Sequence, residues 1–296
     1  MALKHRLMGW EPSDFATYAH AWQRFGGSVN THPDVIRFIM SGGDKTFTFW
    51  HRREKGNVIA AYFVVDERVI GLDVWREYPV SFDEVLIPVA AGQRIWLPDK
   101  TSRLSASLSG QVINAAFNYR NKRKVCLVKE TFSAKTIKKR KGEMRKFLEM
   151  GGECRKLADM PAAEIARLYV YLFKLRFADT VRCYTQENIA RLLAAVSPMI
   201  FGNVLFFQGN PCAIDLVLKA ESDRMIYFDV PNGGVDPQYA HLAPGSLLMW
   251  ANISDARELC VKEEKKMAFS IGLYEKQWDY KLLWAKAQRT GKSLTV

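Results

Sequence analysis

The stretch from Gly209 to Lys286 most narrowly limits what this chain can fold into, because strand and helix signals follow one another there with only short breaks. Ala213 to Ala220 and Met225 to Val230 alternate in the manner of antiparallel strands. After a loop, Ser246 precedes apolar residues at helical spacing, which predicts a capped helix. Two further strands are expected after that helix, over Ala268 to Tyr274 and over Trp278 to Trp284. This order predicts a mixed sheet with one helix packed on it.

The first 134 residues predict another unit of helices and strands. Amphipathic helices are expected over Ser13 to Phe25, with Ser13 able to cap, and over Pro33 to Met40. A helix is also expected over Leu104 to Tyr119, and Arg123 to Val128 is expected to return as a strand to the sheet of this unit. The antiparallel strands expected between these helices are Thr46 to His51, Val58 to Val65, Val69 to Trp75 and Glu84 to Pro88.

The second unit is expected to begin with a basic helix over residues 135–150, which ends at Gly151-Gly152. Cys154 to Leu157 follows as a strand. Apolar stripes then predict helices over Ala162 to Ala178 and Gln186 to Val196. The expected fold class is α/β (α+β), with domains 1–134 and 135–296 and the basic helix at their junction.

The positive charge is concentrated in one segment. The chain of 296 residues has a net charge of +12, and residues 120–146 hold twelve Lys or Arg against Glu130 and Glu143, a local balance of +10. Such a cluster suits an anionic partner, namely tRNA, an anionic lipid or a phosphorylated saccharide, although a solvated helix face is the alternative. The residues chosen for that partner are Lys138, Lys139, Arg140, Lys141 and Arg145.

Several classes of protein are not indicated. The five cysteines are scattered without a CxxC pair, and no histidine stands at metal-ligand spacing, so neither a disulfide framework nor a metal site is expected. The apolar run near the N-terminus is too short for a secretory signal. The uncharged stretch 192–214 is cut by Pro and Gly, which argues against a membrane span. No helix-turn-helix or other sequence-specific DNA motif is found.

Short motifs in a fixed order give the chain a family resemblance. Pro244-Gly245-Ser246-Leu247-Leu248, then Ser270-Ile271-Gly272 and Tyr280-Lys281, resemble the C-terminal domain of the GNAT superfamily. They are similar to its double-domain branch, which includes the Fem-type aminoacyl-tRNA transferases and BioF2/CelD-like proteins. With Arg24-Phe25-Gly26-Gly27-Ser28 and Thr31-His32-Pro33, the whole chain resembles the macrophage-inducible, antimicrobial-peptide-resistance family of Gram-negative bacteria. The resemblance implies tandem GNAT-like domains with mixed, mainly antiparallel sheets.

The resemblance also implies a donor-binding loop. Backbone N–H groups at Gly245, Ser246 and Leu247 begin a helix, and such groups suit the phosphate of coenzyme A or of tRNA. Pro244 and Tyr227 complete the expected donor site. A plain helix start after a Pro-Gly turn is the alternative. The fuller Gln/Arg-x-x-Gly-x-Gly/Ala loop of ordinary acetyl-CoA enzymes is not found, so acyl-CoA and aminoacyl-tRNA both stay open as donors.

Three residues are expected to carry the chemistry. Lys281 matches the aromatic-Lys element of Fem-type transferases and is expected to stabilise charge, with a lysine lying along the sheet edge as the alternative. Asp215 lies in an apolar strand and is expected to act as a base or to position an amine; its alternative is an internal ion pair with Lys219 or Lys281. Arg176 is expected to point toward the acceptor. Asp229 is expected to cap the turn at Pro231-Asn232-Gly233-Gly234.

These observations favour an enzyme, an acyl or aminoacyl transferase without a tightly bound cofactor. The resemblance implies an envelope acceptor such as lipopolysaccharide core, a cytoplasmic location at the inner membrane, and resistance to cationic peptides as the outcome. The alternative is a non-catalytic GNAT-like regulator that binds nucleic acid or membrane. The transferred group, the acceptor, the cleft that is active and the oligomeric state stay open.

Overall fold

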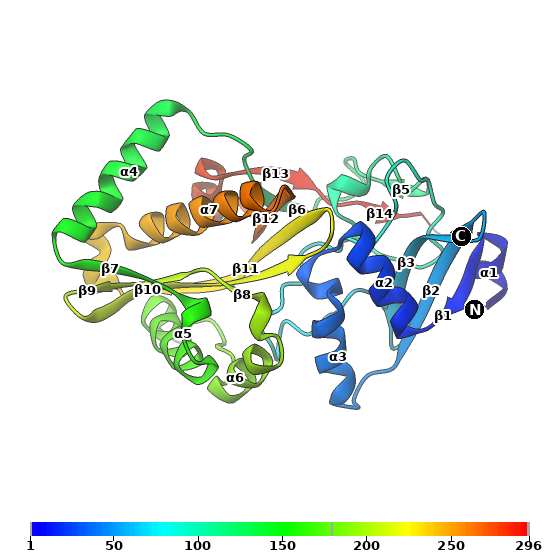
Figure 1. The fold of residues 1–296 in the computed structure, drawn as a ribbon, viewed down its shortest axis with the longest axis horizontal. Coiled ribbons are helices and arrows are strands. Elements are labelled where there is room, and N and C mark those ends of the chain that lie inside the picture. The colour runs from blue at the N-terminus through cyan, green and yellow to red at the C-terminus, as the bar shows by residue number, and fades with distance from the viewer. Residues whose placement is uncertain (1, 179, 295–296) are drawn as a thin grey trace.

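The chain folds into two halves that lie side by side along the long axis of the molecule (Figure 1). The computed structural model describes residues 2–178 and 180–294. Both ends of the described chain lie in the first half, because the last strand returns there from the second half and pairs Lys292 and Ser293 with Ala116 and Ala115. The chain therefore connects the two halves twice, once where it enters the C-terminal half and once where it returns from it.

The N-terminal half is built around a four-stranded antiparallel sheet in the order β1-β2-β3-β4. Asp14 caps the helix α2 by accepting a hydrogen bond from the Thr17 N–H, so Ser13, which the sequence suggested, is not the cap. The elements of this half are α1 (Ala2–Leu7), β1 (Trp10–Ser13), α2 (Phe15–Phe25), α3 (Pro33–Ser41), β2 (Phe47–Glu54), β3 (Asn57–Val65), β4 (Val69–Ile70) and β5 (Ala115–Ala116).

The C-terminal half is built around a larger sheet, in the order β13-β6-β12-β11-β10-β9-β7, with β8 paired to β10. Its neighbouring strands are antiparallel except for β11 and β12, which run parallel. Its elements are β6 (Lys124–Val128), α4 (Ala134–Glu149), β7 (Gly152–Lys156), α5 (Ala162–Phe177), α6 (Gln186–Ala195), β8 (Ile200–Phe201), β9 (Asn203–Phe207), β10 (Asn210–Glu221), β11 (Met225–Val235), α7 (Pro244–Lys262), β12 (Lys266–Leu273) and β13 (Ala285–Arg289). The last strand, β14 (Lys292–Ser293), pairs with β5 of the first half.

Helices cover both faces of the larger sheet. Figure 1 shows α5 and α6 on one face and α7 on the other, with α4 standing beside α7. The helix α5 packs closely because β11 carries a glycine beneath it: a Cβ on Gly234 would lie 2.4 Å from the carbonyl carbon of Leu172 and 2.5 Å from the amide nitrogen of Phe173. Glycine at this position is thus a requirement of the helix-to-sheet contact.

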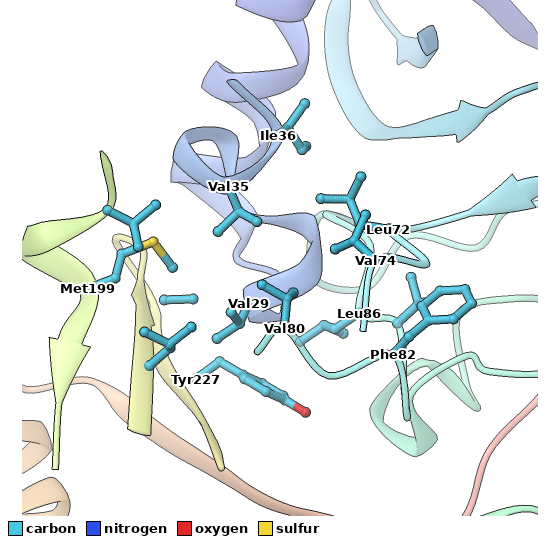
Figure 2. Packing of buried hydrophobic residues seen from close by; sticks show 14 of the residues in the cluster. Val29, Val35, Ile36, Leu72, Val74, Val80, Phe82, Leu86, Met199 and Tyr227 are labelled. Atoms are coloured by element: carbon cyan, nitrogen blue, oxygen red, sulfur yellow. The ribbon is translucent and has the colours of Figure 1, made fainter. Parts of the chain in front are cut away.

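One hydrophobic core runs through both halves. Figure 2 shows Val29, Val80 and Leu86 of the first half packed near Met199 and Tyr227 of the second. All five side chains are buried, and they belong to a single contact cluster. Because apolar surface is removed from water at this boundary, the two halves are held as one packed unit.

The helix expected over Leu104 to Tyr119 is wrong. This segment is irregular, with one short turn of 3-10 helix at Ala106–Leu108 and the two-residue strand β5. Its backbone is bonded to distant segments instead: the Ile113 N–H donates to the Ile95 carbonyl, and the Asn114 amide bonds both backbone groups of Leu97. These long-range bonds take the place of helical ones.

Four strand expectations also need correction. Val69 to Trp75 pairs only over Val69–Ile70, and Glu84 to Pro88 is irregular, with a single bridge from Val85 to Leu104. Trp278 to Trp284 is not a strand, because Lys276–Leu283 is 3-10 helix and the strand begins at Ala285. The strand β6 forms as expected, but it pairs with β12 and β13 in the sheet of the second half.

The other expected helices and strands are confirmed within a few residues at their ends. Among the described residues, no helix combines the length and the apolar composition that a membrane crossing would need. The division into domains 1–134 and 135–296 stays a prediction.

Candidate active site

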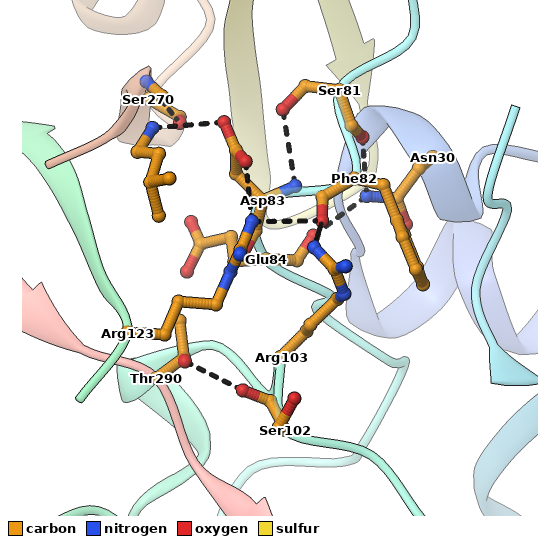
Figure 3. Close-up of polar contacts among 12 residues, drawn as sticks. Asn30, Ser81, Phe82, Asp83, Glu84, Ser102, Arg103, Arg123, Ser270 and Thr290 are labelled. Carbon is orange, nitrogen blue, oxygen red and sulfur yellow. Dashed lines mark hydrogen bonds and ion pairs between the residues drawn. The ribbon is translucent and has the colours of Figure 1, made fainter. Parts of the chain in front are cut away.

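A cluster of acidic side chains lies where the two halves meet (Figure 3). The segment from Ser81 to Glu84 of the first half reaches β11 and β12 of the second. There the Tyr227 hydroxyl donates a hydrogen bond of 2.5 Å to Glu84 Oε1. Asp229, two residues further along β11, lies beside the Ser270 side chain and the Ser81 backbone. Asp229 therefore does not cap the turn at residues 231–234, which continues β11 as strand.

Burial sets the protonation of this cluster. Glu84 and Asp229 are each 4% exposed. Loss of hydration raises the pKa of Glu84, and it raises the pKa of Asp229 well above its usual range, where the nearby Asp83 and Glu84 carboxylates add to the effect. Both carboxyl groups therefore take up a proton more readily than solvated carboxyl groups do, and the rise in pKa is the larger one for Asp229.

Asp83 links the first half to the end of β12. Its Oδ1 lies 2.6 Å from Arg123 Nη2, and its Oδ2 accepts a hydrogen bond of 2.9 Å from the Leu273 N–H. The chain turns at Gly272 with φ of 79°, and a Cβ there would lie 3.1 Å from Asp83 Oδ2. Arg123 also donates to the Asp83 carbonyl at 2.9 Å. Asp83 thus fixes the bend that carries β12 away from β11.

Lys281 lies in the same neighbourhood. Its Nζ donates a hydrogen bond of 2.8 Å to the Leu273 carbonyl and lies 4.9 Å from the centre of the Trp278 ring. Burial lowers the pKa of Lys281, while the Asp83 and Asp229 carboxylates act in the opposite direction. Lys281 lies on a 3-10 helix rather than on the expected strand.

The parallel strands β11 and β12 separate at this cluster. They pair from Met225 with Lys266 to Asp229 with Ser270, and no further pair joins them in the described chain. Beyond that point β12 pairs with β6, whereas β11 continues to Val235 along β10. The separation leaves the far part of β11 without a neighbour on its β12 side, directly next to Asp229 and Lys281.

Arg176 and Asp215 approach that far part of β11. The Arg176 Nη1 donates a hydrogen bond of 3.0 Å to the Gly233 carbonyl. Asp215 pairs with Gly233 across the strands, and a Cβ on Gly233 would lie only 2.1 Å from Asp215 Oδ1. Asp215 also accepts a hydrogen bond of 3.3 Å from the Asn252 amide of α7. Its expected alternative partners, Lys219 and Lys281, are instead bonded to Glu221 and to the Leu273 carbonyl.

Burial raises the pKa of Asp215 to about 6, and the nearby Arg176 guanidinium limits the rise. A carboxyl group with this pKa is divided between its two protonation states near neutral pH. A carboxyl group whose pKa lies near the working pH is better suited to act as a general base than an ordinary aspartate.

The start of α7 offers fewer free amides than the sequence suggested. The Ser246 and Leu247 N–H groups both bond the Ala243 carbonyl, at 3.0 and 3.3 Å. Pro244 has no N–H and is buried. The Gly245 N–H has no hydrogen-bond partner among the described residues, so it is the donor left for a phosphate in this turn. Tyr227 lies apart from this turn, with its hydroxyl on Glu84.

The basic helix α4 divides its cations between two directions. Lys138, Lys141 and Arg145 line a shallow hollow of about 650 Å³ along one face of α4. Lys139 is exposed and lies 3.8 Å from Glu143. Arg140 points the other way: its guanidinium lies 4.8 Å from the centre of the buried Trp284 ring and forms an ion pair of 2.9 Å with Glu143. Arg140 is therefore part of the helix packing.

The sequence reading missed Asp83, Glu84, Arg123 and Ser270 as site residues. Glu84 could have been predicted from the sequence, because it stands directly before the apolar run Val85-Leu86-Ile87. A buried carboxylate there is costly unless it has a partner. Ser270 was part of the motif Ser270-Ile271-Gly272 but was given no role, and Asp83 and Arg123 carry no such signal. Among the residues that the structure describes, no group of His, Cys, Asp or Glu is arranged to hold a metal ion.

Comparison with solved structures shows which fold this chain has. A crystal structure of FemX resembles this chain with a TM-score of 0.64 at 7% identity, covering 98% of each chain. L-PGS from Bacillus licheniformis gives a TM-score of 0.51 at 11% identity, covering 96% of this chain and 93% of that one. A C-terminal domain assigned to a lysylphosphatidylglycerol synthetase of Agrobacterium fabrum gives 0.53 at 11% identity, covering 95% and 91%. At these identities the likeness concerns the fold, which is that of a tandem GNAT-like protein.

The sequence then identifies the family within this class. The family model for Mig-14 matches residues 32–293, so the chain belongs to the Mig-14 family. No curated protein sequence matches the chain. The expected resemblance to the macrophage-inducible family and to the Fem-like double-GNAT branch is confirmed.

Proposed function

We propose that this protein is an acyl or aminoacyl transferase that modifies a cell-envelope precursor, with lipopolysaccharide core or a related glycan as the acceptor. The observation that carries the proposal is the separation of β11 from β12 beside Asp83, Asp229 and Lys281. Acyl transfer needs a held donor carbonyl and a charged or polar group where negative charge develops. The fold shared with FemX and L-PGS supports this reading.

The donor is placed along β11 beyond Asp229. This part of the strand has no β12 neighbour, so its backbone is available to an extended ligand as a strand edge is. The Gly245 N–H, at the start of the helix that follows β11, is the proposed contact for the donor's phosphate, next to Pro244, Ser246 and Leu247. Aminoacyl-tRNA and acyl-CoA both fit this assignment, and neither is a tightly bound cofactor.

The catalytic roles follow from charge and protonation. Lys281 is the proposed stabiliser of the developing oxyanion, because its half-buried ammonium group lies beside the strand separation on the Leu273 carbonyl. Asp215 is the proposed proton acceptor, since its pKa of about 6 suits that role near neutral pH. Arg176, held on the Gly233 carbonyl, is the proposed contact to the acceptor. Tyr227 was expected in the donor site, but its hydroxyl could contact a donor only after its hydrogen bond to Glu84 breaks.

The basic helix α4 is proposed to hold an anionic partner through Lys138, Lys141 and Arg145, with Lys139 and Arg140 contributing charge. A tRNA donor would use this helix through its phosphates. Contact with the inner leaflet of the inner membrane would use the same charges. We favour the tRNA, because the helix lies beside α7, which begins at the proposed donor turn.

The experiment that tests the function is retention of native tRNA against acyl-CoA on the purified protein, followed by mass analysis of any aminoacyl group bound. Enrichment of one aminoacyl-tRNA, together with loss of transfer in Lys281→Ala, would support the aminoacyl reading. Saturable binding of acyl-CoA alone would support ordinary acyl transfer. Retention of neither donor would contradict the enzyme and favour the non-catalytic alternative. Lys276→Ala, an exposed lysine of the same 3-10 helix, is the control variant.

A further inference from the structure

A cavity of about 580 Å³ lies in the N-terminal half, outside the donor site proposed above. Its lining comes from distant parts of the chain: β4, the segment from Lys100 to Arg103, and the end of the chain around β14. Phe82 also lines it, directly before Asp83 and Glu84 of the acidic cluster. The volume lies in the range of small-molecule sites.

Three cationic side chains line the cavity, namely Lys100, Arg103 and Lys292, against the single carboxylate of Asp73. None of the three has a carboxylate oxygen within ion-pair distance among the described residues. Lys100 and Lys292 are exposed, and Arg103 is half-buried. Unpaired positive charges gathered around a cavity are the expected feature of a site for an anion.

Arg103 is held in a fixed position at this cavity. Its Nη1 donates to the Phe82 carbonyl, and the guanidinium lies 4.1 Å from the centre of the Phe82 ring. Its Nε and Nη2 have no partner among the described residues. A guanidinium that is fixed through one nitrogen, with others free, is ready to bind a phosphate through two parallel hydrogen bonds.

The remaining lining suits a polyol rather than a bare anion. The Ser102 hydroxyl and the Asp73 carboxylate line the cavity without side-chain partners in the described chain, and both can bond sugar hydroxyls. Val69, Ile70, Phe82 and Leu294 supply apolar surface, against which the carbon face of a sugar ring can pack. Inorganic phosphate alone would leave most of this lining uncontacted.

The cavity is joined to the acidic cluster through the Phe82 carbonyl. Arg103 donates to this oxygen from the cavity side, and Arg123 Nη2 approaches the same oxygen at 3.4 Å from the side of Asp83 (Figure 3). The chain from Phe82 to Glu84 lies between the cavity and the acidic cluster. A ligand anchored in the cavity would therefore lie within a few residues of Asp83 and Glu84.

We propose that this cavity binds a phosphorylated saccharide, with Lys100, Arg103 and Lys292 on the phosphate and Asp73 and Ser102 on the sugar hydroxyls. The assignment of this ligand as the acceptor rests on the proposed transferase function. The binding itself does not, because it needs no donor.

The test is calorimetric titration of the full chain, without donor, using glucose 6-phosphate, inorganic phosphate and glucose as probes. We expect glucose 6-phosphate to bind more tightly than either of the other probes. Its affinity should fall when salt is added. Lys100→Gln with Lys292→Gln should raise its Kd about tenfold, because two charge contacts are lost. Lys174→Gln with Lys286→Gln removes the same charge from exposed positions away from the cavity and should leave the Kd unchanged. Arg103→Gln should weaken binding further, with thermal unfolding checked for each variant.

Equal affinity in the Lys100 and Lys292 variant and in the wild type would overturn the site. Equal affinity for inorganic phosphate and glucose 6-phosphate would overturn the saccharide assignment, and so would binding of no probe. The two proposals fail separately. Saccharide phosphate binding without any transfer would contradict the transferase and leave the site standing. Transfer to a phosphorylated acceptor with an unchanged KM in the Lys100 and Lys292 variant would contradict the site and leave the transferase standing.

Discussion

Tyr227 and Glu84 stand 143 residues apart in sequence, and a hydrogen bond of 2.5 Å between the Tyr227 hydroxyl and Glu84 Oε1 joins the two halves of the protein. Both side chains are buried. The bond is at once part of the shared core and part of the acidic cluster, because Asp229 and Ser270 lie next to it. The placement of the candidate site therefore depends on how the halves pack.

Removal of this bond should weaken the fold. Tyr227→Phe leaves a buried Glu84 carboxyl with one partner fewer, and we expect a loss of about 1 to 3 kcal/mol in the free energy of unfolding. Chemical denaturation measures it. Tyr239→Phe is the control, since the Tyr239 hydroxyl has no hydrogen-bond partner among the described residues and its ring packs on Phe207 beside a smaller hydrophobic cluster. Equal stability of both variants would show that the bond contributes nothing.

Asp215→Asn should raise stability at neutral pH. Burial raises the pKa of Asp215 from 3.8 to about 6, so the folded state favours the protonated form. Its contribution to stability is full below pH 3.8 and is lost as the pH rises toward about 6. The variant, which stays neutral, should gain about 1 to 3 kcal/mol near pH 7 and nothing in acid. Denaturation across this pH range tests it, with Asp44→Asn, an exposed carboxylate, as control.

The same variant should lose transfer activity if Asp215 is the proton acceptor. If the variant gains stability and loses activity, Asp215 serves function rather than stability. Activity retained in full would remove Asp215 from the proposed mechanism.

Lys281→Ala should reduce transfer by about 100-fold or more, because a preorganised charge at the developing oxyanion is lost. Burial lowers the pKa of Lys281, so wild-type activity should fall on the alkaline side at a lower pH than an ordinary lysine would cause. Rate measurements across the alkaline range check both. Lys281→Arg should keep part of the rate and lose this alkaline fall. A pH profile that is the same in wild type and Lys281→Arg would assign the fall to another group.

Gly234→Ala should destabilise the C-terminal half, by about 2 to 4 kcal/mol, since the new methyl group meets the backbone of Leu172 and Phe173 within 2.5 Å. Thermal unfolding gives the change. Gly142→Ala is the matched control, because a Cβ on this residue of α4 meets nothing within 4 Å. It should be neutral or slightly stabilising, as alanine is a better helix former than glycine. If both variants unfold alike, the close approach of α5 to β11 is not what fixes glycine here.

The cations of α4 should separate into two kinds. Replacing Lys138, Lys141 and Arg145 by Gln should weaken tRNA binding and reduce its dependence on salt, with little change in unfolding. Arg140→Gln should lower stability instead, because it removes the contact with Trp284 and the ion pair with Glu143. Filter binding at several salt concentrations, together with thermal unfolding, measures the two effects. A change in tRNA binding from Arg140→Gln alone would reverse the assignment.

The sequence by itself determined the elements whose signals are local. The apolar stripe of Ile165, Leu168 and Leu172 is sufficient to predict α5, and Pro-Gly before an apolar run is sufficient to predict α7. The order of these elements in the second half, together with short motifs, was enough for the family and for the tandem GNAT-like fold. Local periodicity and turn chemistry act between residues a few positions apart, so they are readable without the fold.

Only the tertiary structure decided what residues 104–119 and the candidate site would be. Residues 104–119 were expected to form a helix but bond to Leu97 and Ile95, and β6 leaves its expected sheet for β12. Asp83, Arg123 and Leu273 meet from three separate segments, and the cavity of Lys100 and Lys292 closes only when the chain's end returns to the first half. Such contacts gain their free energy from burial and pairing across long stretches of sequence, and no local pattern records them.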